Sequence, residues 1–405
     1  MVQRSVLVSG ASVAGPALAS WLARSGWDAT VVEHFDHLPD QGQNVDVRGV
    51  GRQVLRRMRI EEAVRAAHTS EVGVRFVDER GRPVASFPAG TDDSGGGTAE
   101  IEILRGQLAE LLYEQSADEV EYRFGDRISA LHDDEAGVDV EFRHGPDRRF
   151  DAVVIAEGLR SRTRSMIMPD ARPRELGLYI AHLAVPRTDS DSRWWRTMLC
   201  GRGRVIFLRP DNVGTTRAGM FFTSNVRGLD RLGRDDIVAI LRETFADVGW
   251  EAPRVLESLD NGSLYLEDIA QTRLPTWSRG RTALVGDAAY CATPISGMGT
   301  TLALTGAYVL AGELTARDDP RAAFARYEQL LRPLVTQAQH LLPGVPNAVV
   351  PQSRAQRTLI HTALRLAGTP LARRLQATAG RFTTPRAEAI TLPDYPMPQP
   401  RPMAA

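Results

Sequence analysis

Apolar and polar positions follow one another along this chain in patterns that change from strand-like to helix-like and back. Residues 6–8 form a short apolar run of the kind found in buried parallel strands, and a helical pattern follows it as far as Arg24. A second apolar run, residues 29–33, ends in an acidic side chain. This succession of strand, helix and strand predicts a βαβ unit at the N-terminus.

The middle of the chain has the pattern of antiparallel strands, and the last third has that of helices. Alternating residues around glycine turns predict two hairpins, and three further strand-like runs follow them: 71–87, 127–145, 176–187, 204–210 and 216–224. A buried strand and three helical patterns come next: 282–285, 300–316, 320–342 and 353–380. The patterns therefore predict an α/β fold that combines a βαβ layer with a mixed sheet.

The composition is that of an ordinary globular enzyme and excludes several function classes. The 405 residues suffice for about two domains, and the net charge of −1 provides no basic field for nucleic acid. All 49 basic residues are arginine, which excludes a catalytic lysine. The sequence has no run of 18 apolar residues, so we expect no membrane span. Eight scattered histidines and two distant cysteines predict no metal site, no disulfide and a reduced, cytoplasmic setting.

The turn after the first strand carries a variant of the dinucleotide fingerprint. Gly10, Ser12 and Gly15 give the pattern G-x-S-x-x-G, in which the glycines allow a tight turn and close packing of helix on strand. The helix N-terminus offers free N–H groups to a pyrophosphate. Glu33 ends the next strand, where a carboxylate accepts hydrogen bonds from ribose hydroxyls, which favours NAD or FAD over NADP. The alternative is a βαβ unit without a ligand.

A second motif near residue 290 favours FAD. The strand at 282–285 runs into Gly286 and Asp287, and a carboxylate at a strand tip can bind the polyhydroxyl ribityl chain of a flavin. Pro294 and then Gly297, Met298 and Gly299 lead into the long helix, whose first N–H groups would face the flavin pyrimidine. The alternative is a strand–loop–helix connection with an N-capping aspartate.

Together these motifs resemble the flavoprotein aromatic hydroxylases of the para-hydroxybenzoate hydroxylase class, over residues 4–340. The family's second acidic motif, usually Asp-Gly, is matched by Glu157-Gly158, and its flavin-contacting arginine by Arg105, with Gln107 beside it. The segment that holds Asp46 and Arg48 is similar to the one that flanks the flavin ring in tetracycline-modifying monooxygenases.

The resemblance implies a Rossmann-like, GR2-type FAD-binding domain, interleaved with a mixed-sheet substrate domain and a C-terminal helix. The FAD-binding domain would comprise 1–72, 98–175 and 270–335, and the substrate domain 73–97 and 176–269. A helical segment, 336–390, and a loose tail, 391–405, would follow. In the family the mixed sheet covers the flavin, which makes four residues candidates for the substrate lining: His182, Phe207, Met220 and Phe222. Core packing is the alternative for each of them.

The resemblance also implies an FAD-dependent monooxygenase that takes electrons from NADPH or NADH. Because no second dinucleotide fingerprint is present, the reductant would bind transiently. One oxygen of O2 would enter a phenolic or polycyclic natural product through a flavin C4a-hydroperoxide, in antibiotic biosynthesis or modification. Arg48 and His182 are the candidate catalytic residues. We expect a monomer or weak homodimer. Baeyer–Villiger oxidation or epoxidation, or a non-catalytic flavin-binding role, remain alternatives.

Overall fold

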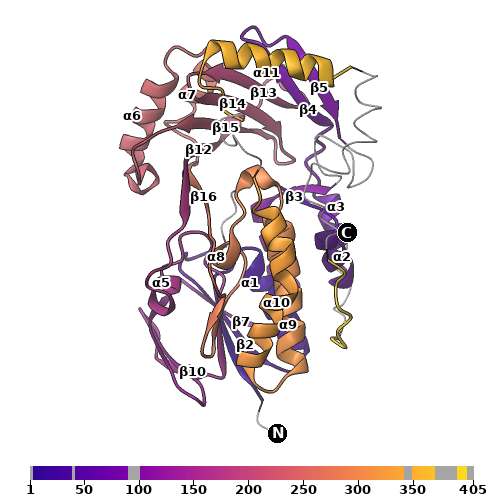
Figure 1. The fold of residues 1–405 in the computed structure, drawn as a ribbon, viewed down its shortest axis with the longest axis vertical. Coiled ribbons are helices and arrows are strands. Elements are labelled where there is room, and N and C mark those ends of the chain that lie inside the picture. The colour runs from indigo at the N-terminus through magenta and orange to yellow at the C-terminus, as the bar shows by residue number, and fades with distance from the viewer. Residues whose placement is uncertain (1–2, 39–41, 90–100, 342–348, 370–389, 399–405) are drawn as a thin grey trace.

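A computed structural model gives the fold and describes residues 3–38, 42–89, 101–341, 349–369 and 390–398 (Figure 1). Parts of every predicted domain lie outside the described residues. They are 1–2, 39–41 and 98–100 of the predicted FAD-binding domain, 90–97 of the substrate domain, 342–348 and 370–389 of the helical segment, and 399–405 of the tail.

A six-stranded sheet in the lower half of Figure 1 contains the N-terminal βαβ unit. Its strand order is β17-β18-β11-β1-β2-β7, and all neighbours are parallel except β17 and β18. The strands are β1 Ser5–Ser9, β2 Asp28–Glu33, β7 Glu121–Phe124, β11 Ala152–Ile155, β17 Ser278–Arg279 and β18 Thr282–Leu284. The predicted first strand is confirmed, and β1 lies in the interior of the sheet as its apolar residues require.

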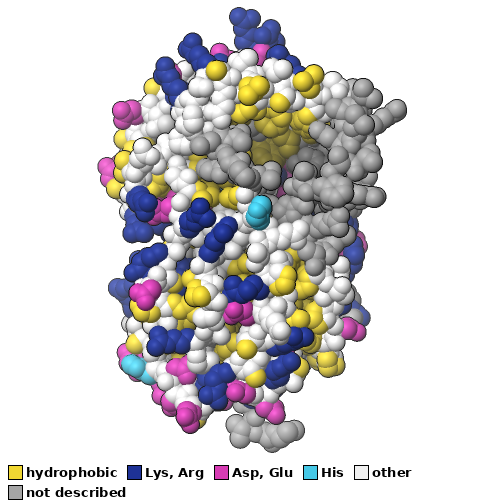
Figure 2. Space-filling model, viewed as in Figure 1, with side chains coloured by type: hydrophobic (Ala, Val, Ile, Leu, Met, Phe, Trp, Pro, Cys, Tyr) yellow, Lys and Arg dark blue, Asp and Glu magenta, His cyan; other side chains and the backbone are white. Residues whose placement is uncertain are grey.

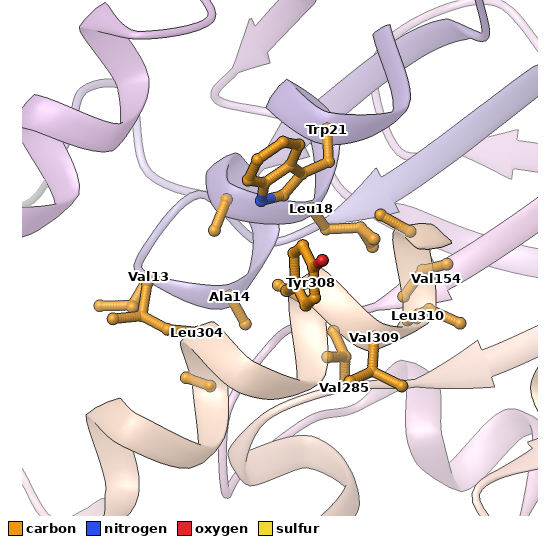
Figure 3. Close-up of a cluster of buried hydrophobic side chains, with 14 of the residues drawn as sticks. Val13, Ala14, Leu18, Trp21, Val154, Val285, Leu304, Tyr308, Val309 and Leu310 are labelled. Atoms are coloured by element: carbon orange, nitrogen blue, oxygen red, sulfur yellow. The ribbon is translucent and has the colours of Figure 1, made fainter. Parts of the chain in front are cut away.

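Two helices that are far apart in the sequence form the main core of this half. Helix α1 (Ala14–Arg24) packs on α9 (Gly299–Ala316), and α10 (Pro320–Ala338) packs on the other side of α9. Figure 3 shows the side chains between α1 and α9, where the rings of Trp21 and Tyr308 meet edge to face with centroids 5.5 Å apart. Helix α9 is apolar on all sides because it is buried on all sides.

A seven-stranded sheet forms the upper half, in the order β16-β12-β15-β14-β13-β4-β5. All neighbouring pairs are antiparallel except β13 and β4. The strands are β4 Gly73–Val77, β5 Pro83–Pro88, β12 Arg174–Pro186, β13 Trp195–Gly201, β14 Arg204–Pro210, β15 Thr215–Thr223 and β16 Leu264–Gln271. The predicted hairpin at 71–87 is confirmed by the pairing of β4 with β5.

The two faces of the seven-stranded sheet have different partners. One face packs on helices α6 (Arg234–Phe245) and α7 (Ala252–Glu257) in a closed apolar core. The other face meets helix α11 (Arg354–Ala367) and Ile295, which belongs to the other half of the molecule. This second face is therefore the one that looks toward the six-stranded sheet.

The remaining elements connect the two halves or cover their edges. Strands β3 (Asn44–Val47) and β6 (Ile101–Leu104) form a two-stranded ribbon, and β8 (Ile128–Asp133), β9 (Val138–Phe142) and β10 (Arg148–Phe150) a small antiparallel sheet that confirms the predicted second hairpin. The short helices are α2 Val50–Arg57, α3 Glu61–Ala66, α4 Arg105–Glu114, α5 Thr163–Ile167, α8 Asp287–Tyr290, η1 Leu229–Arg231 and η2 Pro294–Ser296. None of the helices in the described ranges has the length and apolar character of a membrane span.

The prediction of a loose tail from residue 391 is wrong for its described part. Leu392 and Met397 are buried, and the Tyr395 ring lies against Gly312 of α9, where a Cβ would come within 2.1 Å of it. The Tyr395 hydroxyl donates a hydrogen bond to Glu313. The proline-rich segment is extended and packs against α9. It can lie this close because residue 312 of α9 is a glycine and has no side chain.

Candidate active site

The fingerprint turn is held by backbone contacts that only glycine permits. Gly10 has φ +111°, and a Cβ there would lie 2.6 Å from the carbonyl oxygen of Ala156. A Cβ on Gly15 would lie 1.9 Å from the Gly10 carbonyl oxygen, so the start of α1 can approach β1 only without a side chain. Ser12 lies in the turn between them. The N-terminus of α1 therefore opens at the carboxyl ends of β1 and β11, the usual place for a dinucleotide.

Glu33 is an ionised acceptor at the tip of β2. Its carboxylate accepts hydrogen bonds from the backbone N–H groups of Ala11, at 2.8 Å, and Phe35, at 3.1 Å. Burial acts to raise the pKa of Glu33, but hydrogen bonds from His34 and from the two backbone groups outweigh it, and the pKa lies below its usual range. Each oxygen retains acceptor capacity for a ribose hydroxyl.

Asp287 presents an accessible carboxyl group at the start of α8. It is the first residue of α8, its side chain is exposed, and the protein around it raises the pKa of its carboxyl, an effect that Arg105 opposes. The preceding residue, Gly286, has φ +66° and packs near Ala14 of α1. Asp287 is therefore an accessible acid close to the N-terminal end of α1.

The approach to α9 combines an open helix end with a strained backbone. A Cβ on Gly299 would meet no atom within 4 Å, so the first turn of α9 faces open space. Within the Gly297-Met298-Gly299 motif, Gly297 has φ +62° and Met298 is buried. Thr293, which precedes Pro294, has φ 83° and ψ 151°, a region that β-branched residues avoid. Such strain concentrates at binding sites.

The β3–β6 ribbon brings the remaining predicted flavin residues to the same place. Arg48 forms an ion pair with Asp46 at 2.8 Å, and its backbone N–H donates to the Thr301 hydroxyl of α9 at 3.0 Å. Buried polar atoms of Asp46 (Oδ1), Arg48 (Nε) and Gln107 (Oε1) have no hydrogen-bond partner within the protein. Orphaned buried polar atoms are costly, so a polar ligand is expected to satisfy them.

Glu157 has a different position from that expected of a cofactor contact. Its carboxylate accepts hydrogen bonds from the side chains of Ser9, Ser161 and Thr163 at 2.6–2.7 Å, and from the Thr163 backbone at 3.2 Å. The carboxylate therefore ties the loop after β11 to the end of β1.

Two of the four residues predicted to line the substrate site, Met220 and Phe222, have their side chains on the other face of the sheet. His182 on β12 and Phe207 on β14 both pair with Gly219 of β15, so these residues share the face that looks toward the six-stranded sheet. Met220 and Phe222 follow at the next positions of the pleat, point the opposite way and pack on α6 and α7. They belong to a closed core and do not line the site.

The residues that replace them were missed in the sequence. The inner face carries Phe221 and Trp195, and a Cβ on Gly219 would lie 2.0 Å from the Phe207 ring, which therefore rests on bare backbone. The edge strand β16 adds Tyr265 and Glu267. Figure 2 shows hydrophobic side chains gathered in a hollow of the upper half, over β13 and β4. Only the pairing of β12, β14 and β15 reveals which residues of each strand face inward.

A buried ionic network joins this sheet face to the ribbon. Arg209 of β14 pairs with Glu71, with Nε and Oε2 2.9 Å apart, and with Glu102 of β6. Burial acts to lower the pKa of Arg209, but the two carboxylates raise it, so the arginine is charged. Its guanidinium lies 4.2 Å from the centre of the Trp195 ring. The network fixes the sheet relative to Asn44 and Asp46 of the ribbon.

The arrangement fits a flavin dinucleotide. The turn at Gly10 and the N-terminus of α1 would hold the pyrophosphate, and Glu33 the adenosine ribose. Asp287 would take the ribityl chain, and the open first turn of α9 would face the pyrimidine ring. When bound, the isoalloxazine would lie between the ribbon and the inner sheet face.

Comparisons with known proteins agree with this fit. The model of the FAD binding domain family matches residues 3–341. The flavin-dependent monooxygenase eupH of Phoma sp is 34% identical over 389 residues, which cover 87% of this chain and 89% of that protein. A flavin-dependent monooxygenase of an unknown prokaryotic organism is 36% identical over 342 residues, covering 82% of this chain and 86% of that protein.

Solved structures show the same fold. The crystal structure of tetracycline destructase Tet(51) superposes with a TM-score of 0.78 at 28% identity, and the match covers 97% of this chain and all of that one. The family model, the relatives and the fold lead to one conclusion: this chain belongs to the FAD-binding-domain family of class A flavin hydroxylases and is an FAD-dependent monooxygenase.

Proposed function

We propose that the enzyme uses NADPH or NADH to reduce its FAD and inserts one oxygen atom of O2 into a phenolic or polycyclic small molecule. The bound flavin would supply the redox chemistry and the activation of oxygen. The chain's own residues would hold the flavin, receive the substrate and exclude water.

The support for this proposal comes from two surfaces of different chemical character, one on the cofactor side and one on the seven-stranded sheet. The cofactor side presents Asp287, Arg105 and the first turn of α9. The sheet side presents the aromatic rings of Phe207, Phe221 and Trp195. A flat, mostly apolar ring system matches the sheet side, because aromatic faces pack well on one another and contribute large buried areas.

Relatives support the size of the substrate. The structural neighbour Tet(51) is a tetracycline destructase and thus acts on a polycyclic compound. The sequence has one dinucleotide fingerprint, so the reductant would bind and leave between turnovers.

Anaerobic reduction tests the proposal. FAD-loaded protein is mixed with NADPH or NADH, with and without tetracycline or a panel of phenols, and the loss of the oxidised flavin absorbance is followed. We expect reduction by at least one nicotinamide, faster when a substrate is bound. A flavin that neither nucleotide reduces, with any compound present, contradicts the proposal.

A further inference from the structure

Two polar side chains on the inner sheet face have no partner that explains their burial. In the β12–β16 ladder His182 lies opposite Tyr265 and Ile180 opposite Glu267, so His182 and Glu267 are diagonal neighbours on one face. The Nε2 atom of His182 and the Oε2 atom of Glu267 are buried, 4.0 Å apart, and without a hydrogen bond. Leaving both atoms unsatisfied would cost free energy that a purely structural core would not retain.

The separation of these atoms suits an intervening group. A distance of 4.0 Å is too long for a direct hydrogen bond, but an oxygen between the two atoms can lie about 2.8 Å from each. Each side chain also retains an exposed fraction of 15%, so a ligand can approach the pair from solvent. A hydroxyl fits best, because it can accept from the imidazole N–H and donate to the carboxylate.

The surrounding charges set the protonation of the pair. Burial, assisted by Arg105 and Arg209, lowers the pKa of His182 to about 3, so the imidazole is neutral. Burial raises the pKa of Glu267 to about 7. The other charged groups that act on Glu267 are Arg105 and Arg160, which lower its pKa, and Asp287 and Asp268, which raise it.

We propose that His182 and Glu267 form a subsite for a hydroxyl group of the substrate, in which the imidazole donates to the hydroxyl oxygen and Glu267 accepts its proton in a hydrogen bond. This proposal rests on the proposed function, because it concerns the substrate of that reaction. The pair selects an O–H group over an ether of the same shape and orients the ring that bears it beside Phe207.

A pair of probes tests the subsite by equilibrium binding. FAD-loaded protein is titrated at pH 8.5 with 4-methylphenol, which keeps its proton at this pH, and with its methyl ether, 4-methylanisole. We expect the phenol to bind about tenfold more tightly, the ratio typical of a hydrogen bond to a charged acceptor. Glu267→Gln should remove most of this preference, and His182→Phe should reduce it. Equal affinity of the wild-type protein for the two probes, or no binding of the phenol, overturns the proposal.

Asp268→Asn is the matched control. Asp268 follows Glu267 on β16, is buried and also has a raised pKa, about 6, but its side chain points to the other face. This variant should keep the tenfold preference, and a loss as large as that of Glu267→Gln contradicts the subsite. A second control is the pH profile: the preference should decline as the pH falls through about 7, when Glu267 takes up a proton.

The same preparations separate this proposal from the proposed function. FAD content and NAD(P)H oxidation are measured for each. A protein that binds FAD and oxidises NAD(P)H but binds both probes equally lacks the subsite and keeps the proposed function. A protein whose flavin no nicotinamide reduces loses the proposed function, whatever its preference for the phenol.

Discussion

Single residues of the cofactor turn were predictable because their roles depend on nearby backbone. Gly15 must lack a side chain because a Cβ there would meet the carbonyl oxygen of Gly10, five residues earlier, and the φ of +111° at Gly10 is a property of the turn itself. The close contact of Gly10 with Ala156 was not predictable, because Ala156 follows the distant strand β11. Asp287 follows the end of β18 after two residues, Val285 and Gly286. Glu157 shows the limit of such reasoning. The motif located the residue, but its side-chain donors are Ser9 of β1, Ser161 and Thr163, the first residue of α5.

Glu33→Ala should weaken FAD binding by about 1–3 kcal/mol, because a charged acceptor for the ribose hydroxyls is lost. The measurement is the dissociation constant of FAD by fluorescence titration of apoprotein. Glu121→Ala, on the neighbouring strand β7, serves as the control, because that carboxylate pairs with Arg148 near the surface. Unchanged FAD affinity in Glu33→Ala would show that the ribose is held elsewhere.

The buried carboxyl group of Glu267 should lower the free energy of unfolding at alkaline pH. Its pKa is raised from 4.5 to about 7 in the fold, so between these values the native state binds more protons than the unfolded state, and its contribution to stability falls as the pH rises. With FAD in excess, Glu267→Gln should be more stable than the wild type at pH 8 by about 1–3 kcal/mol.

The advantage of Glu267→Gln should shrink as the pH falls from about 7 toward 4.5, where the wild-type carboxyl is neutral in both states. Urea unfolding of both proteins at pH 8 and pH 5 measures the difference. A variant that is less stable than the wild type at pH 8 is incompatible with an unpaired buried carboxylate.

At the level of elements, five strands of the seven-stranded sheet were predicted, but β13, β16 and the direction in which the side chains face were not. The run that contains Met220, Phe221 and Phe222 has apolar residues at consecutive positions, so alternation gives no direction there. The direction follows from the register with β12 and β14, which is set by residues far away in the sequence. The packing of the C-terminal tail was missed for the same reason. Tyr395 of the tail packs against Gly312 of α9, which is far away in the sequence.

A substitution at Gly219 tests whether Phe207, on the inner face of the sheet, lines the substrate site. Gly219→Ala would place a Cβ 2.0 Å from the Phe207 ring, so the ring must move. We expect a loss of stability of about 1–3 kcal/mol from overpacking, weaker binding of aromatic substrates and unchanged FAD content. Met220→Leu, on the opposite face, should leave substrate affinity unaltered. If substrate affinity is unchanged in Gly219→Ala, Phe207 does not line the site.

For the whole molecule, the ion pairs of Arg209 connect the two halves. Arg209→Met leaves Glu71 and Glu102 buried without their counter-charge and should destabilise the protein by about 3–5 kcal/mol at neutral pH. The loss should be smaller at pH 5, where protonation relieves the two acids. Thermal unfolding at both pH values measures this, and an equal loss at the two would indicate that packing on Trp195 dominates.

The two-part architecture was predictable as a class, because strand–turn–helix motifs and alternating strands are local patterns. The way the halves meet was not, because it depends on contacts between residues far apart in the chain. Arg209 is one of 49 arginines, and nothing near it in the sequence distinguishes it from the others. The same holds for Glu267, whose partner His182 is on another strand.

Incorporation of labelled oxygen into a product would show directly that the enzyme is a monooxygenase of polycyclic phenols. FAD-loaded enzyme is incubated with NAD(P)H, 18O2 and either tetracycline or a panel of polycyclic phenols, and the products are analysed by mass spectrometry. We predict that at least one compound accelerates NAD(P)H oxidation and gains a single 18O atom. If NAD(P)H is oxidised at the same rate with and without every compound and no product carries 18O, the account of this protein as a monooxygenase of such substrates is contradicted.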